Sequence, residues 1–203
     1  MSIIKHGKVM FIKKTICIIV FFLFSIMNIF AHRFAIEIKL TGLSIHPRGA
    51  EHANLFRFNL DRNGFFVLNP GIRIGFEYFI FEDIVSIKIA QGLYRDCANQ
   101  FGGFSHIGFR CRVFQWGNHS FNGGIGPTFF FRRNWYKLEG YSGDDAFFRG
   151  GPEDNWQRRF IWWGGDLEYN YRINERFELS TSVIPPLPFL PALIHVGTRM
   201  LFD

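Results

Sequence analysis

The sequence contains few cysteines, and those present have no metal-site spacing. The three cysteines, Cys17, Cys97 and Cys111, form no Cys-x-x-Cys pair and no Cys/His cluster, so nothing in them indicates zinc. Cys17 lies in the N-terminal segment, Cys97 is expected in a surface loop and Cys111 deep in a strand. Because such positions are unsuited to cross-linking, we expect no disulfide, and we also expect no metal and no cofactor.

The sequence also has little net charge once its N-terminal segment is set aside. The formal charge is +6 and the pI is about 9.4. Four of these charges are lysines of the first 31 residues, which contain no acid, and this leaves +2 for the rest of the chain. A chain so close to neutral lacks the basic surface of a nucleic-acid-binding protein, so we expect no nucleic-acid partner.

Beyond residue 32 the sequence lacks a second long apolar run. Aromatic residues and glycine are abundant instead, with 27 Phe and 21 Gly among 203 residues. Aromatic side chains favour strands, and glycine is costly inside helices. If this chain enters a membrane, strands must take it across.

The N-terminal segment has the three successive regions of a signal peptide. A basic stretch and a nearly unbroken apolar run, residues 15–30, precede Ala31. We expect cleavage after Ala31, which divides the chain into a signal peptide, 1–31, and one domain, 32–203. Two alternatives stay open: translation could start at Met10, or the run could be retained as a transmembrane helix, for which it is short.

From Arg33 onward, apolar and polar side chains alternate with the period of two that is typical of a strand with one apolar face. Each segment that shows this pattern is about ten residues or longer, enough for a tilted strand to cross a bilayer. The eight apolar faces consist of alternate residues within Phe34–Leu40, Leu68–Tyr78, Val85–Leu93, Ile107–Val113, Phe121–Phe131, Ile161–Tyr169, Phe177–Val183 and Ile194–Phe202. In the sixth segment, Ile161 and Trp163 are expected on the apolar face.

The connections between these segments alternate between generous and tight. Generous loops are expected at 45–63, 96–101, 133–156 and 185–190, and tight turns at 81–83, 116–118 and 172–175. Short periplasmic turns and longer external loops are typical of outer-membrane barrels, in which an even strand number returns both termini to the periplasm. We therefore predict an all-β fold, an eight-stranded antiparallel up-and-down transmembrane β-barrel that follows the signal peptide.

The sizes of the side chains indicate which face points outward. The apolar face is built from Phe, Trp, Tyr, Ile and Leu, whereas the polar face is rich in Gly, Ser, Thr and Asn, which suit a narrow interior. We therefore expect the apolar face to contact lipid. The alternative is a soluble lipocalin-like periplasmic carrier with its faces reversed.

Charged side chains on the polar face would then lie in the lumen, where they must pair or hold water. We predict a packed ionic core and no open pore. The predicted core consists of Arg73, Glu77, His106, Arg110, Arg112, Arg132, Asp166, Glu168, His195 and Arg199. Further charges expected on the inner face are Arg33, Glu37, Lys39, Lys88 and Glu178.

Several aromatic residues fall near the ends of the predicted strands. They are Tyr78, Tyr94, Trp116, Tyr169 and Tyr171. Aromatic side chains at these positions suit the girdles that outer-membrane barrels have at both membrane interfaces. Ordinary hydrophobic packing is the alternative for each of them.

Two stretches that contain glycine, Gly123–Thr128 and Gly197–Phe202, add to the strand pattern. With them, residues 32–203 resemble the superfamily of small eight-stranded outer-membrane barrels that includes the OmpA-like and OmpX-like proteins. Barrels of this superfamily usually end on an aromatic residue, whereas Phe202 is penultimate here and Asp203 is last. The resemblance implies an outer-membrane location, contact with outer-membrane lipid and insertion by the barrel assembly machinery.

A lipid-modifying enzyme is an alternative function, because some eight-stranded barrels deacylate lipid A with a Ser, a His and an acid. His119 and Ser120 resemble the His-x-Ser motif of those enzymes only superficially. Neighbouring residues on a strand face opposite sides, so these two cannot form a nucleophile–base pair. The pair also lies beside a predicted periplasmic turn.

Two inward histidines, His106 and His195, could meet the carboxylates of Asp166 or Glu168. A histidine beside a carboxylate is a candidate general base. We expect both histidines to be structural members of the ionic core, and we assign no catalytic residue.

The longest loops carry further charged residues, which we expect to be solvated rather than metal-binding. They are His46 and His52 in the first loop and Asp144, Asp145, Glu153 and Asp154 in the third. Because long loops carry function more often than strands do, loops 45–63 and 133–156 are where an extracellular or envelope protein partner would bind. We therefore expect a non-enzymatic outer-membrane barrel with a structural or partner-binding role.

Overall fold

The computed structural model describes residues 33–46, 52–143, 147–184 and 192–202. The expected signal peptide, its cleavage after Ala31 and the alternative start at Met10 lie outside the described residues. The same holds for Asp144, Asp145, Asp203 and the loop expected at 185–190. Within the described part of the chain, no helix is long and apolar enough to cross a membrane.

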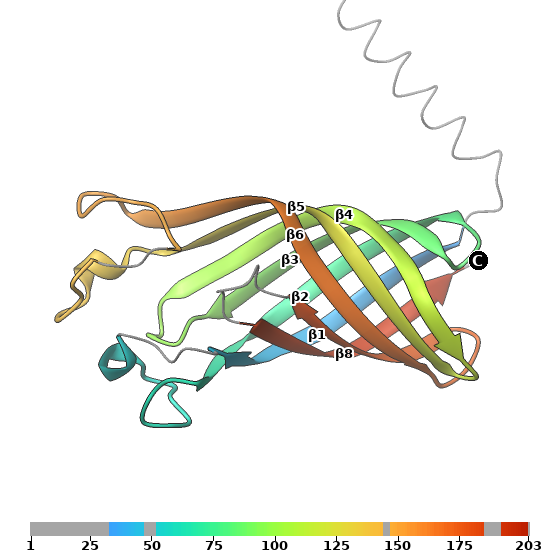
Figure 1. Ribbon diagram of the computed structural model, residues 1–203, viewed down its shortest axis with the longest axis horizontal. Helices are drawn as coiled ribbons and strands as arrows, with labels where there is room; N and C mark the ends of the chain where they lie inside the picture. Colours follow the sequence, from blue (N-terminus) through green and yellow to red (C-terminus); the bar gives the residue numbers. More distant parts are fainter. Residues whose placement is uncertain (1–32, 47–51, 144–146, 185–191, 203) are drawn as a thin grey trace, which may run out of the picture. The chain divides into compact units, whose positions relative to one another are not determined.

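Eight antiparallel strands form a closed barrel, in which each strand pairs with the next and β8 pairs back to β1 (Figure 1). The strands are β1 (Phe34–Ile45), β2 (Phe66–Phe81), β3 (Val85–Arg95), β4 (Phe101–Trp116), β5 (His119–Arg133), β6 (Trp156–Arg172), β7 (Phe177–Ile184) and β8 (Ala192–Phe202). Two short 3-10 helices, η1 (Ala53–Leu55) and η2 (Trp135–Lys137), lie in loops. The predicted eight-stranded antiparallel barrel is confirmed.

The two ends of the barrel differ in the length of their connections. One end, here called the turn end, carries the tight connections 82–84, 117–118 and 173–176. The other, the loop end, carries the longer connections 46–65, 96–100 and 134–155. Phe34 pairs with Phe202, and their rings stack with centroids 4.7 Å apart. The first and last strands therefore begin and finish together at the turn end.

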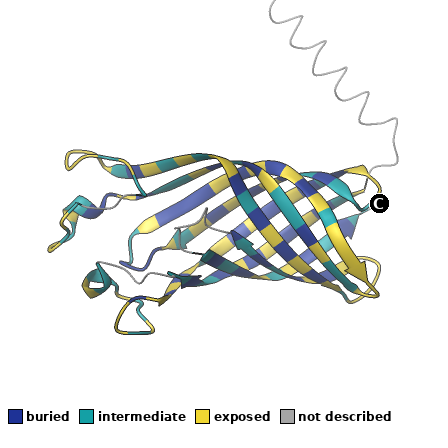
Figure 2. Cartoon of the chain, in the orientation of Figure 1, coloured by how far each residue is buried: buried dark blue, intermediate teal, exposed yellow. Residues whose placement is uncertain are grey.

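Exposure alternates along the strands as predicted (Figure 2). On β1, Glu37 and Lys39 are 3% and 0% exposed, whereas Ile38 and Leu40 are 51% and 69% exposed. The other strands repeat this arrangement, with bulky apolar side chains outside and small or charged ones inside. These faces are the reverse of those that the soluble carrier alternative requires.

The predicted position of Ile161 on the outer face is wrong, because β6 contains a β-bulge. Opposite Pro127 of β5 stand two residues of β6, Trp162 and Trp163, and both are 68% exposed. Proline has no N–H to donate to a neighbouring strand and is commonly found at such irregularities. Beyond the bulge the alternation changes phase, so Ile161 pairs with the buried Thr128 and lies on the inner side.

Tyr94 also lies on the inner side and not in an outer girdle. It packs with Phe130 against a buried cluster of Phe104, Ile184 and Leu193 in the loop half of the lumen. A Cβ at Gly92 would come within 2.2 Å of the Phe104 ring, so glycine makes room for this large side chain. Apolar side chains therefore fill part of the loop half of the barrel interior.

Candidate functional site

A network of buried charges fills the middle of the lumen. Five bases and five acids take part, and each is at most 4% exposed. The ten residues, here called the ionic network, are Lys39, Arg73, Lys88, Arg110, Arg199, Glu37, Glu77, Asp166, Glu168 and Glu178. The formal charges cancel, as is needed where charges leave water.

Two lysines bridge opposite walls of the barrel. Lys39 Nζ lies 2.7 Å from a Glu168 carboxylate oxygen and 2.9 Å from one of Glu37. Lys88 Nζ contacts the same two carboxylates at 2.5 and 2.8 Å. Strands β1 and β3 are not hydrogen-bonded neighbours of β6, so these contacts cross the lumen.

Three arginines complete the network by bridging pairs of carboxylates. Arg73 pairs with Glu37 at 2.8 Å and with Asp166, and it also donates to Ser182. Arg110 lies 2.6 Å from Glu77 and 2.7 Å from Glu168, and Arg199 bridges Glu77 and Glu178 at 2.8 and 2.5 Å. The planar guanidinium fork suits such double contacts. Every strand except β5 supplies a member.

Six of the ten predicted core residues belong to this network: Arg73, Glu77, Arg110, Asp166, Glu168 and Arg199. Glu37, Lys39, Lys88 and Glu178, expected on the inner face but not assigned to the core, complete it. All four occupy inward positions in the alternating pattern of their strands, and this could have identified them from the sequence.

The two predicted core histidines contact threonines and not carboxylates. His106 Nδ1 lies 2.7 Å from the Thr128 hydroxyl oxygen, and His195 Nδ1 lies 2.9 Å from that of Thr41. Both rings are buried. Neither histidine forms a hydrogen bond with Asp166 or Glu168 among the described residues. A histidine–threonine pair gives neither histidine the orienting carboxylate that a general base commonly has.

Arg112, which we predicted in the core, lies at the turn end. Its side chain donates to Gln115 at 2.7 Å and lies 3.8 Å from Asp83. Arg33, expected inside, is half-exposed and binds Asp83 at 3.0 Å. Burial alone would raise the pKa of Asp83, but the Arg33 hydrogen bond and the nearby arginine charges lower it overall.

Arg132, also predicted in the core, lies at the loop end beneath a packed group of loops. Its Nε donates to Gln157 at 2.8 Å, and its guanidinium lies 3.7 Å from the centre of the Trp135 ring. Trp135 packs with three buried residues from β2 and the β3–β4 loop: Val67, Cys97 and Ala98. Residues from all three described loop-end connections therefore meet over the lumen.

These loop residues form what we call the loop cap: Phe56, Val67, Asp96, Cys97, Ala98, Trp135, Leu138 and Tyr141. Asp96 accepts hydrogen bonds from the Trp135 indole at 2.7 Å and from two backbone amides of its own loop. Burial raises the pKa of Asp96. Cys97, expected at the surface, is buried here, and Cys111 is exposed on the outer face of β4; both are free.

This cap was not predicted from the sequence, because its contacts join loops that are far apart in the chain. In the first loop, His46 lies beside Phe56, and His52 lies 4.8 Å from the Tyr141 ring. Asp154 accepts from the Gly151 amide within the third loop. Among the described residues, no three His, Cys, Asp or Glu side chains gather as metal ligands.

His119 and Ser120 face opposite sides, as expected. His119 lies on the outer face at the turn end, 2.6 Å from the Tyr169 hydroxyl, whereas Ser120 accepts from the inner Asn122. A different Ser–His contact does exist at the loop end, where the Ser44 hydroxyl lies 3.1 Å from His46 Nε2. Burial lowers the pKa of His46.

Ser44 nevertheless lacks the surroundings of a nucleophile. It is only 2% exposed and pairs with Val67 and Leu193 within the sheet. Asp61 is the acid whose charge acts on His46. Its carboxylate accepts hydrogen bonds from three backbone amides of its own loop. The contact has two members of a catalytic triad but no open face for a substrate.

The fold and site together define a closed eight-stranded barrel with an apolar outer face, a network of buried charges in its lumen and packed loops at one end. No protein-family model and no curated protein matches this chain. Two solved structures are similar in fold. The N-terminal β-barrel domain of Pseudomonas aeruginosa OprF shares 14% identity, with a TM-score of 0.43 and coverage of 83% of this chain and 97% of that one.

The second is Ail, the attachment invasion locus protein of Yersinia pestis, in complex with the heparin analogue sucrose octasulfate. It shares 10% identity, with a TM-score of 0.40 and coverage of 84% of this chain and 97% of that one. The likeness concerns the fold alone. The function of this chain is therefore argued from its own residues.

Proposed function

We propose that this chain is an outer-membrane barrel that acts through its external loops and conducts no solute. The observation that carries the proposal is the contrast between the two faces of one closed sheet. Rows of exposed Ile, Leu, Phe and Trp cover the outside, while the charges that would make a soluble surface are buried inside. An apolar surface of this extent is stable in lipid and aggregates in water.

The hydrogen bonding of the backbone supports the same environment. A bilayer interior offers no water to unpaired N–H and C=O groups, so spanning sheets must be closed barrels. Here β1 pairs with both β2 and β8, which closes the sheet. Seven of the eight strands have 11 to 17 residues, which is long enough to cross a bilayer, whereas β7 has eight described residues; the strands also show the in–out alternation that a bilayer requires.

Aromatic side chains near both ends of the barrel support a fixed depth in the membrane. At the turn end, Trp116, Tyr169 and Tyr171 are exposed on the outside. At the loop end, the rings of Phe101, Phe131 and Trp156 pack together, with centroids 5.9–6.3 Å apart. The amphipathic rings of Trp and Tyr prefer the level of the lipid headgroups.

The loop cap is the part of the barrel that we propose for partner binding. Trp135, Cys97 and Val67 hold loops 45–63 and 133–156 together over the lumen. A packed set of loops loses less conformational entropy on binding than free loops would. The proposed partner is an extracellular or envelope protein. Export by the 1–31 signal peptide, cleavage after Ala31 and insertion by the barrel assembly machinery belong to the same proposal.

Membrane fractionation and a gel shift test the proposal. The protein should be found in the outer-membrane fraction and should migrate faster in detergent gels before heating than after. Reconstituted into planar bilayers, it should give no steady conductance, because the ionic network blocks the lumen. Recovery from the periplasm without detergent would contradict the membrane location, and stable open-channel currents would contradict the plug.

A further inference from the structure

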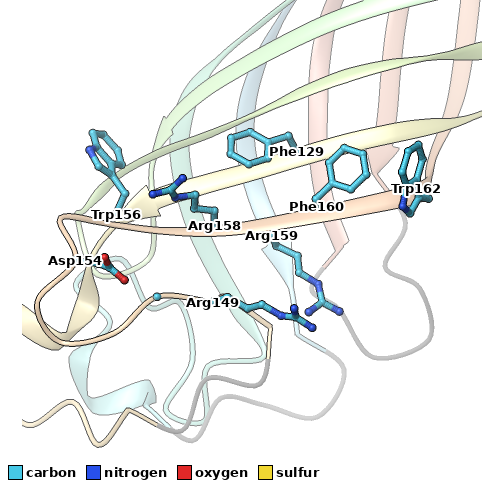
Figure 3. Close-up of a pocket in the computed structure, with 9 residues that line it drawn as sticks. Phe129, Arg149, Asp154, Trp156, Arg158, Arg159, Phe160 and Trp162 are labelled. Atoms are coloured by element: carbon cyan, nitrogen blue, oxygen red, sulfur yellow. The ribbon is translucent and has the colours of Figure 1, made fainter.

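A cavity of about 600 Å³ lies at the loop end of β6 (Figure 3). Its walls combine aromatic rings with cationic side chains. The aromatic residues are Phe129, Trp156, Phe160 and Trp162, and the cationic residues are Arg149, Arg158 and Arg159. In Figure 3, Arg149 and Arg159 extend in one direction, while Arg158 lies on the side of Trp156.

Two local features build this cavity. The third loop returns along β6, where Arg149 and Arg158 exchange both backbone hydrogen bonds, at 2.9 and 2.8 Å. This bridge fixes Arg149 beside the strand. The bulge opposite Pro127 turns Trp162 to the outside, 68% exposed. The cavity is therefore formed by the barrel wall together with a loop segment that is paired to it.

The described residues neutralise the positive charges of this cavity only in part. Within the described chain, no carboxylate forms a salt bridge with Arg149, Arg158 or Arg159. Asp154 also lines the cavity, where its carboxylate accepts from the Gly151 amide at 2.7 Å and keeps its negative charge, so the lining has a net charge of +2. The Nε of Arg159 is buried without a hydrogen-bond partner. Such a group needs an acceptor.

We propose that this cavity binds the phosphate monoester headgroup of an outer-leaflet lipid; this inference rests on the proposed outer-membrane location. Guanidinium groups bind phosphate with paired hydrogen bonds. The exposed rings of Phe160 and Trp162 lie beside the cations, as expected where acyl chains meet headgroups. Basic pockets at this level are known to take lipid headgroups.

The number of cations favours a monoester over a diester. A phosphate monoester carries roughly −1.5 to −2 charges near neutral pH, whereas the diester of an ordinary phospholipid carries one. The net charge of +2 that three guanidinium groups and the Asp154 carboxylate give the lining therefore matches the monoester better. The same chemistry occurs in soluble phosphate, so the test has to separate the two sources.

The test uses the mature chain in nanodiscs of phosphatidylcholine alone, or with an equal mole fraction of either phosphatidic acid or phosphatidylglycerol. Native mass spectrometry counts the lipids that stay bound after release from the disc. Phosphatidic acid, a monoester, should be retained at least about tenfold more than phosphatidylglycerol, a diester. Equal retention of the two lipids would overturn the proposal.

The variant with both Arg149→Gln and Arg158→Gln should lose this preference. Both side chains are exposed at the surface, so the variant should still show the heat-dependent gel shift of a folded barrel. The matched control carries both Arg57→Gln and Arg62→Gln, which remove the same two charges from exposed positions in the first loop. A double variant that keeps the preference, or a control that loses it, would contradict this site.

Inorganic phosphate added to discs of phosphatidylcholine alone separates the two sources. It should raise the unfolding temperature much less than phosphatidic acid does. An equal rise would show that the cavity takes soluble phosphate, and the lipid proposal would be wrong. A chain that fails to enter discs at all would contradict the proposed membrane location instead, so the two failures are distinguishable.

Discussion

The ionic network and the loop cap both contain buried carboxylates, but the groups that stabilise these carboxylates differ. In the network, each carboxylate contacts at least one base. Glu168, for example, contacts Lys39, Lys88 and Arg110. In the cap, the single carboxylate of Asp96 is held by neutral donors, the Trp135 indole and two amides. In the lumen each buried charge faces an opposite charge, whereas in the cap neutral hydrogen bonds and the nearby charge of Arg132 offset only part of the effect of burial on Asp96.

The largest expected effect comes from breaking the network at its centre. Glu168→Gln should leave Lys39, Lys88 and Arg110 without one of their anions, at a cost of about 3–5 kcal/mol in the free energy of unfolding. Urea titration in detergent micelles, read by the gel shift, measures this loss. Glu175→Gln, at an exposed position in a tight turn, is the control. Equal urea midpoints for the two variants would refute the central role of Glu168.

A smaller and more local loss is expected in the cap. Trp135→Ala removes the ring on which the three loops pack, which costs about 3 kcal/mol of local stability. Limited proteolysis should then cleave connections 46–65 and 134–155 faster, while the gel shift of the barrel stays. Glu139→Gln, at an exposed position two residues after the same short helix, should leave cleavage unchanged. Loss of the gel shift would instead show that cap and barrel unfold together.

The cap should also respond to pH through Asp96. Below the ordinary Asp pKa of 3.8, the Asp96 carboxyl is protonated in both the closed and the open cap. The closed cap then has all of the stability that the raised pKa of Asp96 gives it. As pH rises from there through the raised pKa, the open cap loses its proton first, and the closed cap loses stability. Cleavage should therefore speed up towards neutral pH, relative to an unstructured substrate. Asp96→Asn should remove this dependence, and an unchanged profile would contradict it.

The smallest effect is expected at the Ser44–His46 contact. Because Ser44 is buried against Val67, Ser44→Ala should leave the acylation pattern of outer-membrane lipids unchanged. Mass spectrometry of lipids from cells that produce either form measures this. A change in acyl-chain number that depends on Ser44 would show that the contact is catalytic.

The barrel could be predicted from the sequence because strand alternation is local. Each residue's side of the sheet follows from its neighbours two places away, as for Glu37 and Lys39 on β1. The prediction failed for Ile161, where the bulge changed the phase. Pro127 within a predicted strand was the signal for that irregularity. Tyr94 failed because its position near a strand end was given more weight than its alternation.

The pairing within the site could not be predicted to the same degree. The sequence identifies inward charges, but the partner of each depends on how the strands are staggered around the barrel. Lys88 on β3 meets Glu168 on β6, 80 residues away. The loop cap was missed altogether, because Trp135 and Cys97 come from different loops and neither loop has a periodic pattern. Contacts between irregular segments leave no local trace in a sequence.

The ionic network also constrains the order in which the barrel can be completed. Arg199 lies on β8, the last strand, and holds Glu77 of β2 and Glu178 of β7. A sheet that contains only β1 to β7 would have four of the bases against all five acids. It would therefore expose an unbalanced carboxylate as well as two open edges. When β8 pairs with β1 and β7, the unbalanced carboxylate gains Arg199 and both open edges close in one step. We therefore expect insertion to be all-or-none, with no long-lived seven-stranded intermediate in the membrane.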